Sequence, residues 1–305
     1  MFRKVSLKII VIVFVSLLAL VLISKISDHK KGNRTFKEVL TEFDANQISK
    51  IQISNGANEN NTIELSKNKD KWTISCNNKK FNADKQILVS MINELNKIHP
   101  SSVASTKKDR WEKYQVDDSS ATRVKLFAGN ILKGDILAGK FSYSGQSGKS
   151  YIRIYGDKTT YGVTGDQSSI VKSQPDSFKD KTVISSDKKN WEKLTYSYPA
   201  DSSFILVKNN NYWEVNGIKT DSVKTAGFLS SINYVRHYNI SKTAPVKSSP
   251  DYELKIEGKK IASIIIKGYD QNGTFIVSSN ENPGVFFEGN DLKKKLFPGK
   301  SKFQK

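Results

Sequence analysis

Apolar and polar residues alternate in short runs along much of the chain, a pattern typical of strands that bury one face. Residues 48–54 alternate in this way, and a second alternating run begins at Ile63. Ile63 and Leu65 fall on one face of that run, while Trp72 and Ile74 share a face beyond a polar Lys/Asn/Asp turn. The pattern predicts a strand followed by an antiparallel hairpin.

This pattern occurs twice. The segment IELSKNKDKW from Ile63 and the segment FILVKNNNYW from Phe204 align without a gap, and they end in Trp72 and Trp213, 141 residues apart. Self-similarity at a fixed period is the sequence signature of a repeated structural unit. We therefore predict one unit in two copies, with Trp72 and Trp213 as markers of the two cores.

A helix is predicted after each hairpin. Asp84 and Asp221 are placed to cap these helices by accepting bonds from backbone N–H groups of the first turn. Apolar residues then recur at i, i+3 and i+4 spacing, so that each helix is expected to lay one face on a sheet. The two stripes are Ile87, Leu88, Met91, Ile92, Leu95 and Ile98 in the first copy, and Val223, Ala226, Phe228, Leu229, Ile232 and Val235 in the second.

Further strand patterns follow each helix, at 124–127, 131–137, 151–154 and 160–163 in the first copy and at 252–256, 261–266, 274–277 and 285–287 in the second. This order predicts an α+β fold: a duplicated antiparallel sheet with one covering helix per copy, after an N-terminal transmembrane helix. The predicted segments are a membrane anchor (1–27), a stalk (28–45), a first repeat (46–182) and a second repeat (183–305). The pattern leaves open whether the copies form one sheet or two domains.

Residues 9–24 form a run of sixteen apolar or small residues without a charge. At about 1.5 Å per residue the run spans roughly 24 Å, and snorkelling of the flanking Lys8 and Lys25 would extend it toward the bilayer core of about 30 Å. A cleaved signal peptide and a buried core helix are the alternatives, but no A-x-A-like site follows the run. We predict an uncleaved single-pass anchor in the bacterial inner membrane. Because long downstream domains translocate largely regardless of charge, the body is expected outside the cytoplasm.

The formal net charge is +19, from 49 basic and 30 acidic residues, and it is spread along the chain. Proteins that bind nucleic acid usually concentrate basic residues on one face. The spread therefore favours a solvated surface over nucleic-acid binding, with a surface facing anionic lipid or acidic glycan as an alternative. The one tight cluster, Lys293-Lys294-Lys295, is interpreted as a solvated terminal turn.

Recognisable catalytic and metal-binding motifs are absent from the sequence. HExxH, CxxC, G-x-S-x-G and GxxxxGK[ST] do not occur, and the lone Cys76 allows no internal disulfide. His29, His99 and His237 lack zinc-ligand spacing. We therefore predict no catalytic residue, no metal site, no cofactor and no enzymatic activity. A hydrolase that uses His99 or His237 in a dispersed site is the least favoured alternative.

The segment WEKYQVD, from Trp111 to Asp117, belongs to the first copy alone. Trp111 and Tyr114 are candidate interaction residues, as exposed aromatic contacts for a ligand or partner. The alternative interpretation is that both rings close the first helix against the sheet.

Several motifs together resemble a known family. They are the pair Ala83-Asp84, W-x-x-Y-x-V-D-D from Trp111, G-K-x-Y-I-R from Gly148, Y-G-V from Tyr161 and F-K-D-K from Phe178. Over about residues 36–240 the chain resembles the bacterial family called domain of unknown function four thousand three hundred and forty. The resemblance implies a single-anchor protein that is found near components of gliding-type ABC exporters, and it carries over no catalytic residue. The second copy lacks the W-x-x-Y motif and has Ser249-Pro250-Asp251-Tyr252 there instead.

The sequence thus predicts a non-enzymatic, membrane-anchored extracytoplasmic protein. Its expected role is that of an accessory or interaction module of a cell-envelope complex, with an ABC-type transporter as the partner that the resemblance implies. The alternative is a module that binds envelope glycan or another ligand through Trp111 and Tyr114. The sequence does not identify the ligand or partner.

Overall fold

A computed structural model describes residues 36–56, 62–76, 78–144, 147–165, 174–271 and 273–304, together with Ser16. Apart from Ser16, the predicted anchor at 9–24 lies outside the described residues. In the described part of the chain, no helix is both long enough and apolar enough to cross a membrane.

The first large sheet is antiparallel and has the strand order β4-β3-β2-β1-β6-β7-β8-β9-β5. Its strands are β1 (Lys50–Asn55), β2 (Ile63–Asn68), β3 (Lys71–Cys76), β4 (Lys79–Asn82), β5 (Ser102–Ser105), β6 (Thr122–Ala128), β7 (Ile131–Ser144), β8 (Ser147–Ile154) and β9 (Thr160–Thr164). The hairpin predicted from alternation is β2–β3, in which Leu65 lies opposite Ile74.

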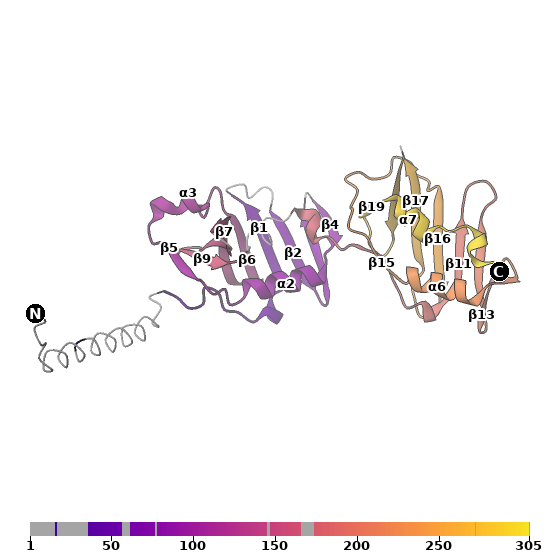
Figure 1. Cartoon of the computed structure of the whole chain (residues 1–305), viewed down its shortest axis with the longest axis horizontal. Helices are drawn as coiled ribbons and strands as arrows, with labels where there is room; N and C mark the ends of the chain where they lie inside the picture. The colour runs from indigo at the N-terminus through magenta and orange to yellow at the C-terminus, as the bar shows by residue number, and fades with distance from the viewer. Residues whose placement is uncertain are drawn as a thin grey trace, which may run out of the picture.

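The second large sheet is also antiparallel, with the order β14-β13-β12-β11-β16-β17-β18-β19. Its strands are β11 (Trp191–Ser197), β12 (Phe204–Asn209), β13 (Tyr212–Val215), β14 (Ile218–Lys219), β16 (Tyr252–Gly258), β17 (Ile264–Gln271), β18 (Thr274–Ser279) and β19 (Phe286–Glu288). The first eight strands of the first sheet follow the same order. The two halves therefore form two sheets and not one, and these sheets lie side by side in Figure 1.

The strand before the hairpin lies in the interior of each sheet, as the fourth strand in the order. On β1, Ile51 lies opposite Leu65 of β2 and Leu126 of β6. On β11, Leu194 takes the same place between β12 and β16. Both side chains are completely buried, because the alternation that the sequence shows places them on the face that each sheet turns toward its core.

One helix covers each sheet: α2 (Lys85–Leu95) and α6 (Ser222–Ile232). The predicted caps are confirmed, because Asp84 accepts from the N–H groups of Gln86 and Ile87, and Asp221 caps α6 in the same way. The buried residues are Leu88, Met91, Ile92 and Leu95 in α2, and Thr225, Phe228, Leu229 and Ile232 in α6. Each residue of the second set lies 137 positions after its counterpart in the first.

Part of each predicted stripe is wrong. In α2, Ile87 is 36% exposed, and more positions differ in α6. Val223 is 80% exposed and Ala226 is exposed, whereas Thr225 is buried. Val235 is buried, but it lies beyond the helix in β15 (Tyr234–Arg236). The apolar pattern mispredicted this face because the inward position of the first turn holds a threonine, whose hydroxyl donates to the carbonyl of Asp221.

Short elements complete the described part of the chain. They are η1 (Ala45–Gln47), η3 (Lys108–Arg110), α3 (Trp111–Tyr114), α5 (Pro175–Phe178), β10 (Thr182–Ser185), η4 (Lys188–Asn190), α7 (Asn290–Leu296) and η5 (Lys300–Phe303). The strand β10 pairs with β15 in a two-stranded sheet. Each large sheet has its own hydrophobic core, and Phe81 is packed against both cores, so that it lies at the junction between them.

Candidate functional site: a lysine-lined groove beside α6

The C-terminal segment is fixed against the second sheet by aromatic contacts. Phe303 is completely buried, and its ring centroid lies 5.8 Å from that of Phe204 and 5.1 Å from that of Phe228. The hydroxyl of Tyr198 donates to the carbonyl of Pro298 at 2.8 Å. The backbone N–H of Asp221 donates to the carbonyl of Phe303 at 2.9 Å. These contacts hold α7 and η5 next to α6.

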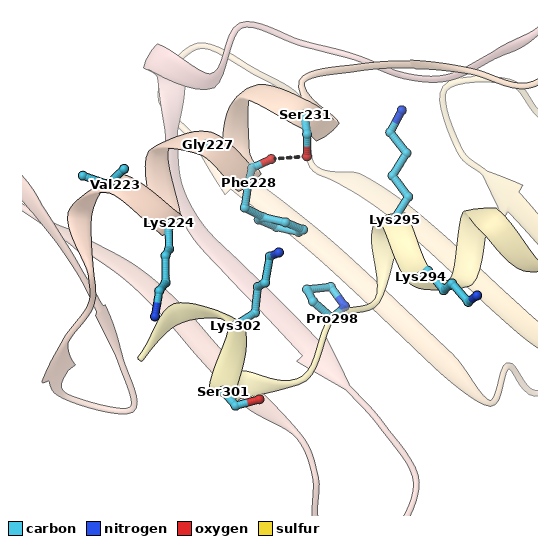
Figure 2. Close-up of a pocket in the computed structure, with 10 residues that line it drawn as sticks. All are labelled: Val223, Lys224, Gly227, Phe228, Ser231, Lys294, Lys295, Pro298, Ser301 and Lys302. Carbon is cyan, nitrogen blue, oxygen red and sulfur yellow. Dashed lines mark hydrogen bonds between the residues drawn. The ribbon is translucent and has the colours of Figure 1, made fainter. Parts of the chain in front are cut away.

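The three segments enclose an open groove of about 700 Å³. Its basic residues are Lys224 from α6, Lys294 and Lys295 from α7, and Lys302 from η5 (Figure 2). Phe228 and Pro298 supply apolar surface between these lysines. The groove therefore combines positive charge with an apolar floor.

The charges of this groove lack acidic partners. None of its lining residues is an aspartate or a glutamate, and none of its four lysines forms an ion pair with a described residue. The Nζ of Lys224 donates to the carbonyl of Gln304 at 2.9 Å. The neighbouring Lys293, by contrast, pairs with Asp270 at 2.7 Å. An uncompensated group of ammonium ions favours an anionic ligand or an acidic protein surface.

Sequence reasoning missed this groove. It identified Lys293-Lys294-Lys295 as the one tight basic cluster but interpreted it as a solvated turn. The structure places two of those lysines beside Lys224, about 70 positions earlier in the chain. The run of lysines was the one feature of the sequence that could have indicated the groove. The packing of α6 against the C-terminal segment, which brings Lys224 to this run, could not be predicted from the sequence.

The predicted interaction residue Trp111 lies in the first unit, away from the groove. Its ring centroid is 3.6 Å from the guanidinium carbon of Arg153, a buried residue of β8. Arg153 forms an ion pair with Asp118 at 2.6 Å and donates to the carbonyl of Val116 at 2.9 Å. The indole N–H of Trp111 donates to the carbonyl of Lys158 at 3.0 Å. Trp111 thus helps to hold α3 on the sheet.

Tyr114 makes contacts of the same kind. Its ring centroid lies 4.6 Å from that of Tyr151 on β8, and its hydroxyl donates to the carbonyl of Ala104 at 3.2 Å. The W-x-x-Y-x-V-D-D and G-K-x-Y-I-R motifs therefore meet in one cluster. These contacts join α3 to β8, to Lys158 and to Ala104 of β5, and none of them involves the first helix, α2. The role of Trp111 and Tyr114 in binding stays a prediction.

The two repeat-core markers have different surroundings. Trp72 on β3 is only 4% exposed and belongs to the core of the first sheet. Trp213 on β13 is only partly buried and lines a cavity. The two tryptophans share a place in the strand order but not the same environment.

Buried polar groups at the junction have structural partners. The Nζ of Lys181 donates to the carbonyls of Asp176, Ser177 and Lys179, and burial lowers the pKa of this lysine. The Glu281 carboxylate accepts from the N–H of Ser185 at 2.7 Å, and burial raises its pKa. These residues stabilise the strands where the two halves meet.

The histidines of the described chain contact backbone and carboxylate groups. His99 Nδ1 lies 3.2 Å from the carbonyl of Glu38. His237 Nε2 lies 2.8 Å from the carbonyl of Glu288, and its Nδ1 lies 3.7 Å from the carboxylate of Asp291. Among the residues that the structure places, no group of three or more His, Cys, Asp or Glu is arranged to hold a metal ion.

Comparison with known proteins gives one match. A family model described as "Domain of unknown function (DUF4340)" matches residues 76–256. No curated protein and no solved structure matches the chain. The matched range includes α2, the Trp111 cluster and α6, and it ends before α7 and η5, which form two walls of the groove.

Proposed function

The chain belongs to the DUF4340 family, and we propose that it acts by binding, as a membrane-anchored extracytoplasmic interaction module of a cell-envelope complex. The observation that carries this proposal is the groove, in which four lysines that form no ion pair with a described residue lie beside an apolar floor. An acidic protein surface fits this chemistry, because its carboxylates would pair with the lysines and its apolar side chains would contact Phe228 and Pro298. We propose an ABC-type transport complex as the assembly, in line with the resemblance of the sequence.

The anchor in this proposal is the uncharged run at 9–24, which would hold the body at the outer face of the inner membrane. Protease added to intact spheroplasts should then digest the body, and protease added to inverted vesicles should leave it intact. Protection of the body in spheroplasts would overturn the proposed orientation.

We also propose that the two sheet units arose as copies of one unit. The shared strand order and the constant spacing of 137 between the buried residues of α2 and α6 support this origin. The ends of the two units also correspond, because the N–H of Asp84 donates to the carbonyl of Phe178 at 2.8 Å, just as the N–H of Asp221 donates to the carbonyl of Phe303 at 2.9 Å.

The binding proposal is tested by crosslinking in intact cells, followed by purification of the full-length protein from membranes. One variant replaces Lys224, Lys294, Lys295 and Lys302 with glutamate. The matched control reverses four exposed lysines of the first unit, Lys71, Lys85, Lys133 and Lys158, so that both proteins change net charge equally. We expect the same partner with the wild type and the control, and its loss with the groove variant. Equal recovery with all three proteins would contradict the proposal.

A further inference from the structure

A second cavity lies on the other side of α6 and has a different chemistry from the groove. It measures about 330 Å³ and is enclosed by α6, the hairpin β12–β13 and η4. Two aromatic side chains, Tyr212 and Trp213, and three lysines, Lys188, Lys189 and Lys208, line it. The size falls within the range of about 300–1,000 Å³ that is usual for small-molecule sites.

Two of the residues of α6 that line the cavity are small. Ser222 and Ala226 line it, whereas the residues 137 positions earlier, in α2, are Lys85 and Val89. In the first unit Trp72 is only 4% exposed, and in the second unit Trp213 remains partly accessible. The two units thus differ at the place where a ligand could reach the indole.

The polar groups around the cavity divide into two sets. Lys188 donates to the hydroxyl of Ser230, and Thr220 donates to the backbone carbonyl of Trp213 at 3.0 Å, so both have partners in the protein. Lys189 and Lys208 are exposed, and within the described residues neither of their ammonium groups forms an ion pair. The Nζ of Lys219 lies 4.9 Å from the ring centroid of Tyr212 and adds to the positive field. Two ammonium groups are therefore available to a ligand beside the aromatic rings.

We propose that this cavity binds an acidic saccharide. The face of an indole carries partial negative charge and is flat, so it suits the C–H face of a sugar ring, while the ring hydroxyls stay in contact with water and polar groups. A carboxylate or phosphate on the sugar would accept charge-assisted hydrogen bonds from Lys189 and Lys208. A neutral sugar would form no charge-assisted hydrogen bonds with those ammonium groups, and an anion without a sugar ring would not stack on Trp213. This inference rests on the cavity alone and does not depend on the proposed partner of the groove.

The test measures binding of defined probes to the full-length protein in detergent, by calorimetry and by tryptophan fluorescence. The carboxylate probe is a tetrasaccharide of alternating glucuronic acid and N-acetylglucosamine, and the phosphate probe is glucose 1-phosphate. The controls are the neutral tetramer of N-acetylglucosamine and inorganic phosphate. We expect at least one acidic sugar to bind at least tenfold more tightly than both controls.

Variants assign the binding to the cavity. Ala226→Val narrows it with the residue type found 137 positions earlier in α2, and Lys189→Ala with Lys208→Ala removes the free charges. Because all three residues are exposed, melting temperatures should stay unchanged while affinity falls at least tenfold. The glutamate variant of the groove should keep full saccharide affinity, which separates this inference from the proposed function. Equal binding of acidic and neutral sugars, binding of neither acidic probe, or unchanged affinity in both cavity variants would overturn the proposal.

Discussion

Arg236 of the second unit and Asp84 of the first unit form an ion pair across the junction. The Asp84 side chain is 4% exposed and that of Arg236 is 16% exposed, so the pair is largely shielded from water. Asp84 also caps α2 through the N–H groups of Gln86 and Ile87. One carboxylate therefore fixes the start of a helix in one unit and holds the other unit against it.

This pair should stabilise the junction. Arg236→Met would leave the buried carboxylate of Asp84 without its charge partner, and we expect the free energy of unfolding to fall by about 3 kcal/mol. Chemical denaturation of the wild type, Arg236→Met, Asp84→Asn and the double variant forms a cycle that isolates the interaction. The double variant should lose at least about 1 kcal/mol less than the sum of the single losses. Additive losses would mean that the pair contributes nothing specific.

Two glycines should respond to alanine in opposite directions. A Cβ on Gly139 of β7 would lie 2.2 Å from the carbonyl oxygen of Tyr114 and 2.7 Å from Val116 Cγ1, so Gly139→Ala should destabilise the protein by about 1–3 kcal/mol. A Cβ on Gly227 of α6 would meet no atom within 4 Å, so Gly227→Ala should stabilise it by about 0.5–1 kcal/mol. Thermal and urea unfolding measure both changes. Equal effects at the two positions would contradict the close contact between Gly139 of β7 and the backbone carbonyl of Tyr114 in α3.

Trp111 should contribute to stability through its contact with Arg153. Trp111→Ala removes a cation–π contact and the hydrogen bond to Lys158, and we expect a loss of about 2–3 kcal/mol in the free energy of unfolding. Tyr114→Phe removes only the hydroxyl bond to Ala104 and should lose about 1 kcal/mol. If the double replacement by alanine abolishes partner recovery while leaving the melting temperature unchanged, then the interaction role of these residues is correct and the structural one is wrong.

Asp117 should make stability depend on acid pH. Burial raises the pKa of its carboxyl group, but hydrogen bonds from the hydroxyl and N–H groups of Ser119 and Ser120 outweigh that effect and hold the pKa at about 2, below its ordinary value of 3.8. A carboxylate whose folded pKa is depressed stabilises the fold above its unfolded pKa and loses this contribution as pH falls through the folded value. The stability difference between wild type and Asp117→Asn should therefore be constant above about pH 5 and shrink between about pH 4 and pH 2. Urea denaturation at each pH measures it, and a difference independent of pH would contradict the assignment.

Local patterns were enough to predict the strands before each hairpin, the hairpins, most strands after each helix and both helix caps, but not the short strands β4, β5, β10, β14 and β15. The hairpin β2–β3 and the caps Asp84 and Asp221 depend on residues only a few positions apart. Strand order could not be obtained in this way, because β1 pairs with β6 and Ile51 meets Leu126 far along the chain. Alternation predicts which face of a strand is buried, but it does not predict which other strand pairs with it.

The candidate sites were predicted less well than the fold. The groove brings Lys224 of α6 together with Lys302 of η5, and the packing of the C-terminal segment, such as that of Phe303 against Phe228, places these lysines in one groove. Similarly, Trp213 lies 141 positions after Trp72, but it is only partly buried and lines a cavity. Periodicity identifies positions that correspond between the units and does not show how their neighbours fill space.

We propose above that the groove beside α6 contacts a partner in the cell envelope. Val223 lies at this groove and is 80% exposed, whereas Ile131, in the first sheet, is 63% exposed and serves as the control. The most direct measurement is photocrosslinking in intact cells, with a photoreactive amino acid placed at one of these positions. We expect one defined protein adduct from position 223, which is absent from position 131 and is lost when the four groove lysines are changed to glutamate. No adduct at 223, or the same adducts at both positions, would contradict it.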